Sequence, residues 1–235
     1  MIKIKLADHV FVIENKYAYV EQLCNDYLTE EVAKSTIRVT EDEMQSENKN
    51  DGNWSFPYLE SLAVYRKIAE HLLADDILLF HCSALSIDGK AYLFTAPSGT
   101  GKSTHTRLWR EHFGSRVTMI NDDKPLLVVR KDAVTVYGTP YGGKDNIQTN
   151  TSAKVAGIVI LHQAEYNEIQ RMTAKEAYPM LLNQTYRRSD AEGMIKTMDL
   201  VQKLSELSVY SLGCTISYEA VELAWNTLNE AGGDC

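Results

Sequence analysis

The stretch APSGTGKS, residues 96–103, has the residue types and spacing of a phosphate-binding loop, with Ala in place of the usual first Gly. It stands between the apolar run AYLFTA and the amphipathic run KSTHTRLWREHF, so a strand is expected to turn sharply into a helix. Gly99 and Gly101 let backbone N–H groups approach one anion, which the helix N-terminus also favours. We expect Lys102 to reach the β- and γ-phosphates and the Ser103 hydroxyl to bind Mg²⁺.

The predicted nucleotide-binding residues are those of this loop and of the first helical turn after it. They are Ser98, Gly99, Thr100, Gly101, Lys102, Ser103 and Thr104. A plain β-to-α turn that carries a surface lysine is the alternative. The apolar strand before the loop and the amphipathic helix after it favour the nucleotide site.

Two adjacent carboxylates, Asp122 and Asp123, follow the apolar run VTMI further along the chain. One of them can hold Mg²⁺, directly or through water, while the other accepts the proton of an attacking hydroxyl. The residues alone do not assign the two roles. An acidic turn between strands is the alternative, and its position after a phosphate-binding loop favours the metal and phosphate site.

Cationic side chains near these motifs are further candidates. Lys144 lies in the glycine-bearing stretch GTPYGGKDN, residues 138–146, from which it could reach a γ-phosphate or an acidic substrate group. A simple turn before the next strand is equally compatible with that stretch. Arg187 and Arg188 could clamp a phosphate or form a solvated pair. His81 ends the run ILLFH, and on the residues alone it is a hydrogen-bonded structural histidine.

The elements that must position these residues alternate between strands and helices. Strands are expected at IKIKL, VFVI, TIRVT, VTMIN, LLVV, AVTVYG, VAGIVILH and SVYSL, and a hairpin at Asp88-Gly89. Helices are expected over 58–74, over the run after the loop as far as Gly114, and over 217–231. Capping-box spacing starts two more helices at Thr173 and Ser189, and 41–53 is expected to be a loop. Hairpins among these elements predict an α/β fold with a mixed sheet.

The composition is that of a globular protein with a net charge of −8, which disfavours a nucleic-acid partner. Residues 1–60 carry 6 Lys and Arg against 12 Asp and Glu. We therefore expect a small acidic N-terminal subdomain over 1–56 and a catalytic domain over 57–235. The four cysteines form no C-x-x-C pair, and neither a signal peptide nor a membrane span is recognisable, so a cytoplasmic protein with reduced thiols is expected.

The order of His81, the phosphate-binding loop and the Asp pair resembles the catalytic domain of HPr kinase/phosphorylase. That domain shares its P-loop core with ATP-dependent phosphoenolpyruvate carboxykinases. Residues 77–146 look most like a group of small bacterial HPr kinase-like proteins, through LLFHCSALSIDGKAYLFTAPSGTGKSTHTRLW, NDDKP and GTPYGGK. The likeness is weaker over 147–225, and 1–56 resemble no domain of HPr kinase. It implies a mixed-sheet P-loop core of the HPr kinase catalytic-domain type, preceded by a small α+β lead-in.

Residue by residue, the resemblance implies a P-loop lysine at Lys102, a metal-binding hydroxyl at Ser103, and a metal ligand and catalytic base at Asp122 and Asp123. It also implies a place near the transferred phosphate for His81. Thr104 stands where HPr kinases carry Glu, as in the carboxykinases, so HPr itself is not the expected substrate. Some small relatives are linked to phosphorylation of peptides made by the ribosome, which implies a Ser-containing peptide among the candidate acceptors.

Together these features predict an ATP- and Mg²⁺-dependent kinase that transfers the γ-phosphate to a hydroxyl of a peptide, protein or small molecule. A non-catalytic ATP-binding regulator is the alternative. A carboxykinase is disfavoured because the chain is short for a two-lobed body, and neither an L-S-G-G-Q nor an N-K-x-D motif is present. The sequence leaves open the acceptor, reversal by inorganic phosphate and the number of subunits in any homo-oligomer.

Overall fold

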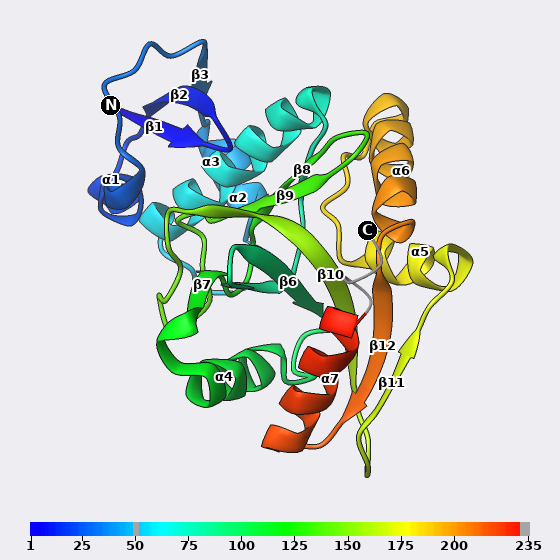
Figure 1. Ribbon diagram of the computed structural model, residues 1–235. Helices are drawn as coiled ribbons and strands as arrows, with labels where there is room; N and C mark the ends of the chain where they lie inside the picture. The colour runs from blue at the N-terminus through cyan, green and yellow to red at the C-terminus, as the bar shows by residue number, and fades with distance from the viewer. Residues whose placement is uncertain (49–51, 231–235) are drawn as a thin grey trace. The chain divides into compact units, whose positions relative to one another are not determined.

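The computed structural model describes residues 1–48 and 52–230, and its chain divides into two compact units (Figure 1). The first comprises Met1–Asp75 and the second Asp76–Cys235. The boundary expected at 56/57 thus differs from the one that the packing defines. The difference arises because helix α3 (Phe56–Leu72) belongs with the first unit: its buried Glu60 carboxylate accepts the backbone N–H groups of Lys16, at 2.5 Å, and Tyr17, at 3.0 Å.

The first unit is a three-stranded sheet with helices packed on α3. Strands β1 (Ile2–Leu6) and β2 (His9–Glu14) form an antiparallel hairpin, and β3 (Ser35–Arg38) pairs with β2 in parallel. Alternate residues of β1 are buried, as its period-2 apolar pattern requires. Helices α1 (Ala18–Leu23) and α2 (Glu41–Ser46) both contact α3.

The loop expected over 41–53 is wrong at its start, because Glu41–Ser46 form helix α2. Thr40 caps this helix in a complete capping box with Glu43. Such a box satisfies N-terminal backbone donors within the chain and so favours the start of a short polar helix. Residues 49–51 of the expected loop lie outside the described residues.

The second unit is built on a nine-stranded mixed sheet, which confirms the predicted α/β class. The strand order is β4-β8-β9-β10-β6-β5-β7, with β12 beside β10 and β11 beside β12. Pairing is parallel between β10 and β6 and between β10 and β12, and antiparallel elsewhere. The strands are β4 (Ile77–Leu79), β5 (Ser83–Ile87), β6 (Lys90–Thr95), β7 (Val117–Asn121), β8 (Leu126–Val129), β9 (Val134–Tyr137), β10 (Ser152–Gln163), β11 (Glu168–Arg171) and β12 (Val209–Cys214).

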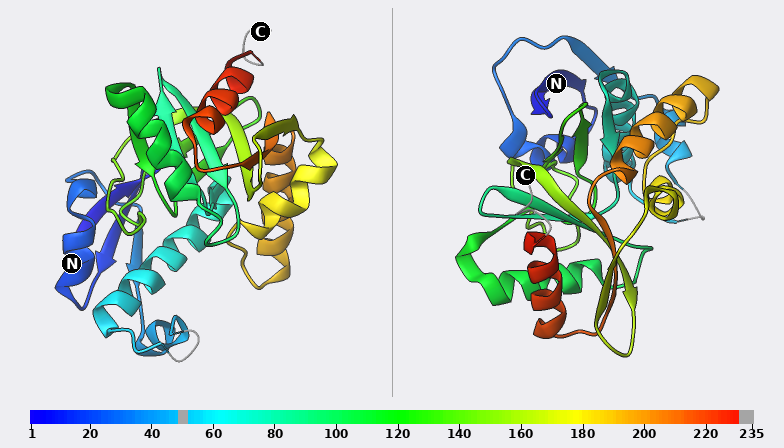
Figure 2. Two further views of the ribbon diagram at one scale, coloured as in Figure 1. Left: turned by 90° about the horizontal axis from the view of Figure 1, so that it is seen from below. Right: turned by 45° about the vertical axis from the view of Figure 1, so that its right-hand side comes forward.

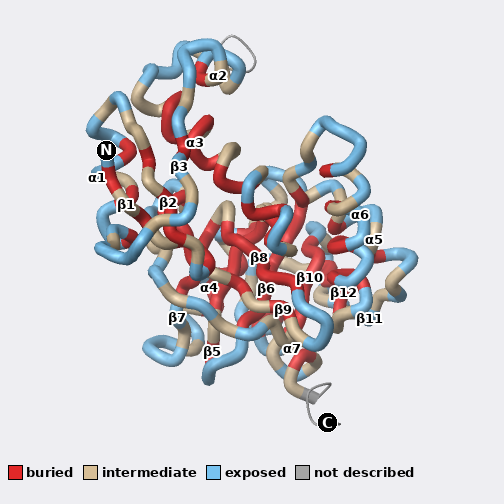
Figure 3. Tube along the Cα trace, turned by 90° about the horizontal axis from the view of Figure 1, so that it is seen from above, coloured by how far each residue is buried: buried red, intermediate tan, exposed pale blue. Residues whose placement is uncertain are grey.

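Helices of the second unit accompany this sheet (Figures 1 and 2). They are α4 (Lys102–Phe113), α5 (Ala174–Asn183), α6 (Ala191–Ser205) and α7 (Tyr218–Glu230). Helices α4 and α7 pack on each other, and α5 packs on α6. Trp109 of α4 is fully buried with Tyr92 and Phe94 of β6, in the core that Figure 3 shows as buried tube along the central strands. This packing fixes the start of α4 relative to the end of β6.

Local sequence signals mark several ends of helices and strands in the second unit. The hairpin turn is at Asp88 and Gly89, whose φ angles of 51° and 79° are those of a tight left-handed turn, and α4 ends at Gly114 with φ 57°. Thr173 forms the expected capping box with Glu176. The other expected cap was wrong by one residue: Asp190, not Ser189, caps α6 by accepting the Gly193 N–H. Within the described ranges, no helix is both long and apolar enough to span a bilayer.

Candidate active site

The topology brings three segments of the second unit to one edge of the sheet. Strand β5 lies between β6 and β7 and runs antiparallel to both. The carboxyl ends of β6 and β7 therefore meet where β5 begins, with Ser83 opposite Phe94 and Ala84 opposite Asn121. Consequently the segments 81–82, 96–101 and 122–124 converge. They carry His81, the glycine-bearing turn and the Asp pair, respectively.

The turn after β6 has the conformation that its glycines allow. Gly99 has φ 82° and Gly101 has φ 115°, a region that side-chain-bearing residues rarely adopt. No side chain in the described part of the chain caps α4, so the backbone donors of its first turn are left for a ligand. Ser98, Gly99 and Ser103 are exposed there. The turn therefore presents to solvent an uncapped helix N-terminus, a feature that favours negatively charged groups.

Lys102 is held inside this turn and is only 8% exposed. Its Nζ donates to the Ala96 carbonyl at 2.9 Å. Burial lowers the pKa of Lys102, and the nearby carboxylates of Asp123 and Asp122 act against that shift. The ammonium group is thus within the electrostatic influence of the two carboxylates in the turn after β7.

Asn121, the last residue of β7, ties two loops together from a fully buried position. Its Oδ1 accepts the backbone N–H groups of Asp123 at 2.8 Å and Lys124 at 2.7 Å. Its Nδ2 donates to the Thr139 carbonyl and hydroxyl, both at 3.1 Å, and to the Tyr141 carbonyl at 3.4 Å. One amide side chain therefore orients the Asp pair and the start of the loop 138–146.

Asp122 points into the protein and is 6% exposed. The Ser83 hydroxyl donates to its Oδ1 at 2.5 Å. Its Oδ2 lies against Gly143, where an added Cβ would be 2.9 Å from that oxygen. A side chain at position 143 would therefore have to displace this carboxylate, which favours glycine where the loop 138–146 approaches it.

Asp123 is more open, with a side chain 30% exposed, and it interacts with two cationic or titratable groups. Its Oδ1 lies 3.4 Å from Nε2 of His81, and its Oδ2 lies 3.2 Å from Nζ of Lys124. Nδ1 of His81 is 2.9 Å from Oε1 of Gln184, whose carbonyl also accepts the His81 N–H. Burial lowers the pKa of His81, and Lys102 adds to this, whereas Gln184 and Asp123 oppose it.

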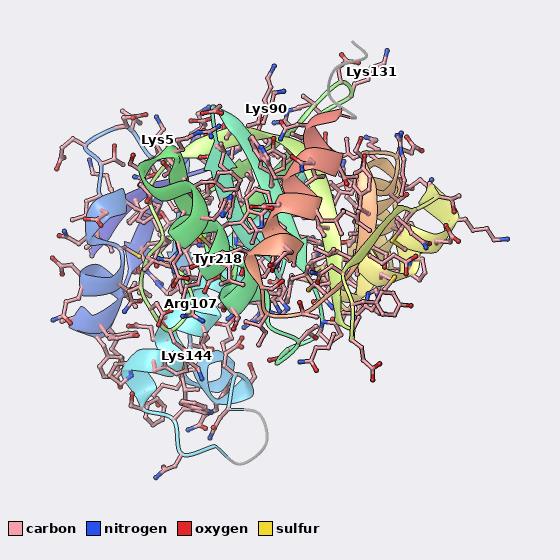
Figure 4. The ribbon with its side chains drawn as sticks, turned by 60° about the horizontal axis from the view of Figure 1, so that its bottom comes forward. Lys5, Lys90, Arg107, Lys131, Lys144 and Tyr218 are labelled. Carbon is pink, nitrogen blue, oxygen red and sulfur yellow. The ribbon has the colours of Figure 1, made fainter. Side chains whose placement is uncertain are left out.

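The structure thus brings His81, Lys102, Asp122 and Asp123 together, but it leaves other candidates outside this cluster. Lys144 is exposed on the loop that carries Gly143 (Figure 4). Arg187 donates to the Leu182 carbonyl, and Arg188 pairs with Asp190.

Sequence reasoning missed Ser83, Asn121 and Gln184 as positioning residues. Asn121 directly precedes the Asp pair, at a strand end where an Asx-type turn is common, so a local signal was present. Gln184 is 103 residues from His81 along the chain, and no local pattern could have joined them.

The oxygen atoms at this edge are of the type that Mg²⁺ prefers. Magnesium in nucleotide sites is held by one or two carboxylates together with phosphate oxygens and water. Ser103, Asp122 and Asp123 offer such oxygens. No group of three or more His, Cys, Asp or Glu side chains within 1–48 and 52–230 is arranged to hold a metal by itself. The donor set fits a metal that is shared with phosphate.

A cavity of about 430 Å³ is lined by the turn 99–101 but not by His81 or the Asp pair. It opens at the carboxyl ends of the parallel strands β10 and β12. Its walls are residues 99–101, the α4 side chains Thr104, His105 and Leu108, the strand residues Leu161, Gln163 and Cys214, and Ala164, Thr215 and Ile216. The Gln163 amide donates to the Thr100 carbonyl at 3.3 Å, which fastens the rim to the turn. Pockets at the carboxyl ends of parallel strands commonly bind ligands.

No protein-family model matches the chain, and no curated protein matches it. Among solved structures, the chain is similar to one described as the Hpr(Ser) kinase/phosphatase from Coxiella burnetii, with a TM-score of 0.37 and 14% sequence identity. The match covers 66% of this chain and 99% of that chain. This is a distant likeness in fold, too low for residue-by-residue argument.

Proposed function

We propose that this chain is an HPr kinase-like phosphotransferase that moves the γ-phosphate of ATP to a hydroxyl of an acceptor. The observation that carries the proposal is the convergence of Lys102, Asp122, Asp123 and His81 beside an uncapped helix N-terminus. A phosphate-binding turn alone would serve a binding protein equally well. The adjoining pair of carboxylates, one of them paired with a histidine, adds the proton acceptor that phosphoryl transfer to a hydroxyl needs.

The nucleotide phosphates lie on the P-loop formed by residues 96–104. Backbone N–H groups of the α4 first turn bind the phosphate oxygens, and Lys102 exchanges the Ala96 carbonyl for a phosphate oxygen. A charged acceptor makes a stronger hydrogen bond than a neutral carbonyl, which favours this exchange. Lys144, on the loop next to Asp122, approaches the γ-phosphate or the acceptor.

Mg²⁺ would be held by Ser103 and by Asp122, with phosphate oxygens completing its coordination. When bound, the ion neutralises charge on the transferring phosphoryl group. Ser83 holds the Asp122 carboxylate in one orientation, and Gly143 leaves room for it. These contacts support Asp122, rather than Asp123, as the metal ligand.

Asp123 accepts the proton of the attacking hydroxyl. Its greater exposure and its approach to His81 support this role over the metal role. Gln184 orients His81 through Nδ1, and the ring stabilises the Asp123 carboxylate through Nε2 when it is protonated; His81 also lies near the transferred phosphate. The acceptor is a Ser-containing peptide, a protein or a small molecule that enters beside this pair.

Nucleotide binding and transfer by the Lys102→Ala variant test the proposal. Removing a charge-assisted phosphate contact is expected to lower ATP affinity by about one to two decades. Calorimetry with MgATP measures this, and Lys131→Ala, at an exposed lysine of the same unit (Figure 4), is the matched control. Unchanged binding in Lys102→Ala would refute the P-loop assignment.

Transfer is followed with γ-labelled ATP and Ser-containing peptides, read by mass spectrometry. Phosphorylated product that depends on Asp123 supports the kinase. Tight ATP binding with no transfer to any acceptor would instead favour an ATP-binding regulator.

A further inference from the structure

His105 is a buried titratable residue that the proposed reaction does not use. It lies one turn into α4, is 3% exposed, and lines the cavity beside residues 99–101. Phe94 packs against the ring with a centroid distance of 5.0 Å, so its orientation is fixed. A polar ring held rigidly in the wall of a cavity lined by both apolar and polar side chains is a candidate for ligand recognition.

Trp109 determines which ring nitrogen of His105 carries the proton. The indole Nε1–H of Trp109 donates to Nε2 of His105 at 3.0 Å. Because an indole nitrogen can only donate, Nε2 must be unprotonated, and the proton lies on Nδ1. Among the described residues no acceptor pairs with this Nδ1–H group. His105 therefore offers one hydrogen-bond donor of fixed identity, and the residue faces the cavity.

We infer that this cavity holds the nucleoside part of the nucleotide and that Nδ1–H of His105 donates to an acceptor atom of the nucleoside. The inference rests on the proposed function, since the phosphates must lie on the same turn. Gly99, Thr100 and Gly101 belong to both the turn and the cavity wall, so a nucleotide can reach from one to the other. The volume of about 430 Å³ is within the range of ligand pockets, and Leu108 and Leu161 supply apolar surface for a flat ring.

Calorimetry with ADP and with inorganic pyrophosphate, each with Mg²⁺, separates the two parts of the site. The wild-type protein binds ADP more tightly than pyrophosphate. His105→Phe keeps a ring that can pack on Phe94 but removes the donor, so ADP binding weakens roughly three- to tenfold while pyrophosphate binding is unchanged. His112→Phe, also on α4 but outside the cavity wall, changes neither affinity.

Equal wild-type affinities for the two ligands overturn the inference but leave the phosphate-binding turn intact. Binding of neither ligand overturns the proposed function and the inference with it. Equal weakening of both ligands in His105→Phe also overturns it, because the role of His105 is then structural.

A second measurement on the wild-type protein covers the case in which His105→Phe does not fold. Long-range ¹H–¹⁵N spectra identify the tautomer of each histidine. We expect the Nδ1–H form for His105, with an Nδ1 resonance that shifts on addition of ADP and not of pyrophosphate. An Nε2–H tautomer, or an Nδ1 resonance that ADP leaves in place, contradicts the inference.

Discussion

Replacement of Asn121 by Ala is expected to loosen two loops at once and to lower the free energy of unfolding by about 3–5 kcal/mol. From a fully buried position the side chain accepts two hydrogen bonds, from the backbone of Asp123 and Lys124, and its two amide N–H groups are shared among three acceptors of Thr139 and Tyr141. Each buried polar group that loses its hydrogen-bond partner lowers the free energy of unfolding by roughly 1–3 kcal/mol. Groups on a loop that opens regain part of this by bonding to water. The sum places Asn121→Ala at the upper end of single substitutions.

Urea denaturation followed by circular dichroism measures this loss, with the signal of each unit fitted separately because the chain has two compact units. Asn226→Ala, at an exposed position of α7, is the matched control and should change the free energy of unfolding by less than about 0.5 kcal/mol. MgATP binding through residues 96–104 should survive in Asn121→Ala, while transfer is lost with the orientation of Asp123. A loss of stability no larger than that of the control would refute the positioning role.

Three further predictions concern the same site and its supporting helix. Asp123→Asn should keep MgATP bound and abolish transfer, because the amide cannot accept the proton, whereas Asp122→Asn should raise the Mg²⁺ concentration needed for half-maximal transfer; full activity in both variants would contradict the assigned roles. Lys144→Ala should lower the transfer rate more than ATP affinity, since its contact strengthens as charge shifts, and Lys144→Arg need not restore it; normal turnover in Lys144→Ala would return this loop to a simple turn. Thr173→Ala should lower the free energy of unfolding by about 1 kcal/mol through loss of the α5 capping box, and an unchanged denaturation midpoint would count against the cap.

The parts of this site that lie close together in the sequence could be predicted from it. The turn 96–101 and the Asp pair carry their own signals, namely glycines before a helix and carboxylates at a strand end. The mixed sheet also followed from hairpins among alternating strands and helices. Both kinds of signal, preferred backbone conformation and apolar periodicity, can be read from neighbouring residues in a single sequence.

The contacts between segments that are distant in the sequence depend on the order of strands in the sheet. No local pattern says that β5 inserts between β6 and β7, yet that insertion is what brings His81 beside Asp123. The boundary between the two units depends on another long-range contact, since Glu60 of α3 binds the backbone N–H groups of Lys16 and Tyr17. Ser189 and Asp190 are adjacent residues that can both cap a helix, so spacing alone could not choose between them.

The hydrogen bond from Lys102 to the Ala96 carbonyl means that any anion binding at the turn 96–101 must compete with that carbonyl for the ammonium group. The ammonium group is already paired, so an incoming anion must displace a carbonyl rather than fill an empty place. A multiply charged phosphate chain can outcompete a neutral carbonyl, because its hydrogen bonds are charge-assisted and several backbone donors bind it together. A single carboxylate has fewer contacts to offer in exchange. On the proposed function, the hydrogen bond of Lys102 to the Ala96 carbonyl would therefore favour polyphosphates over single carboxylates at this turn.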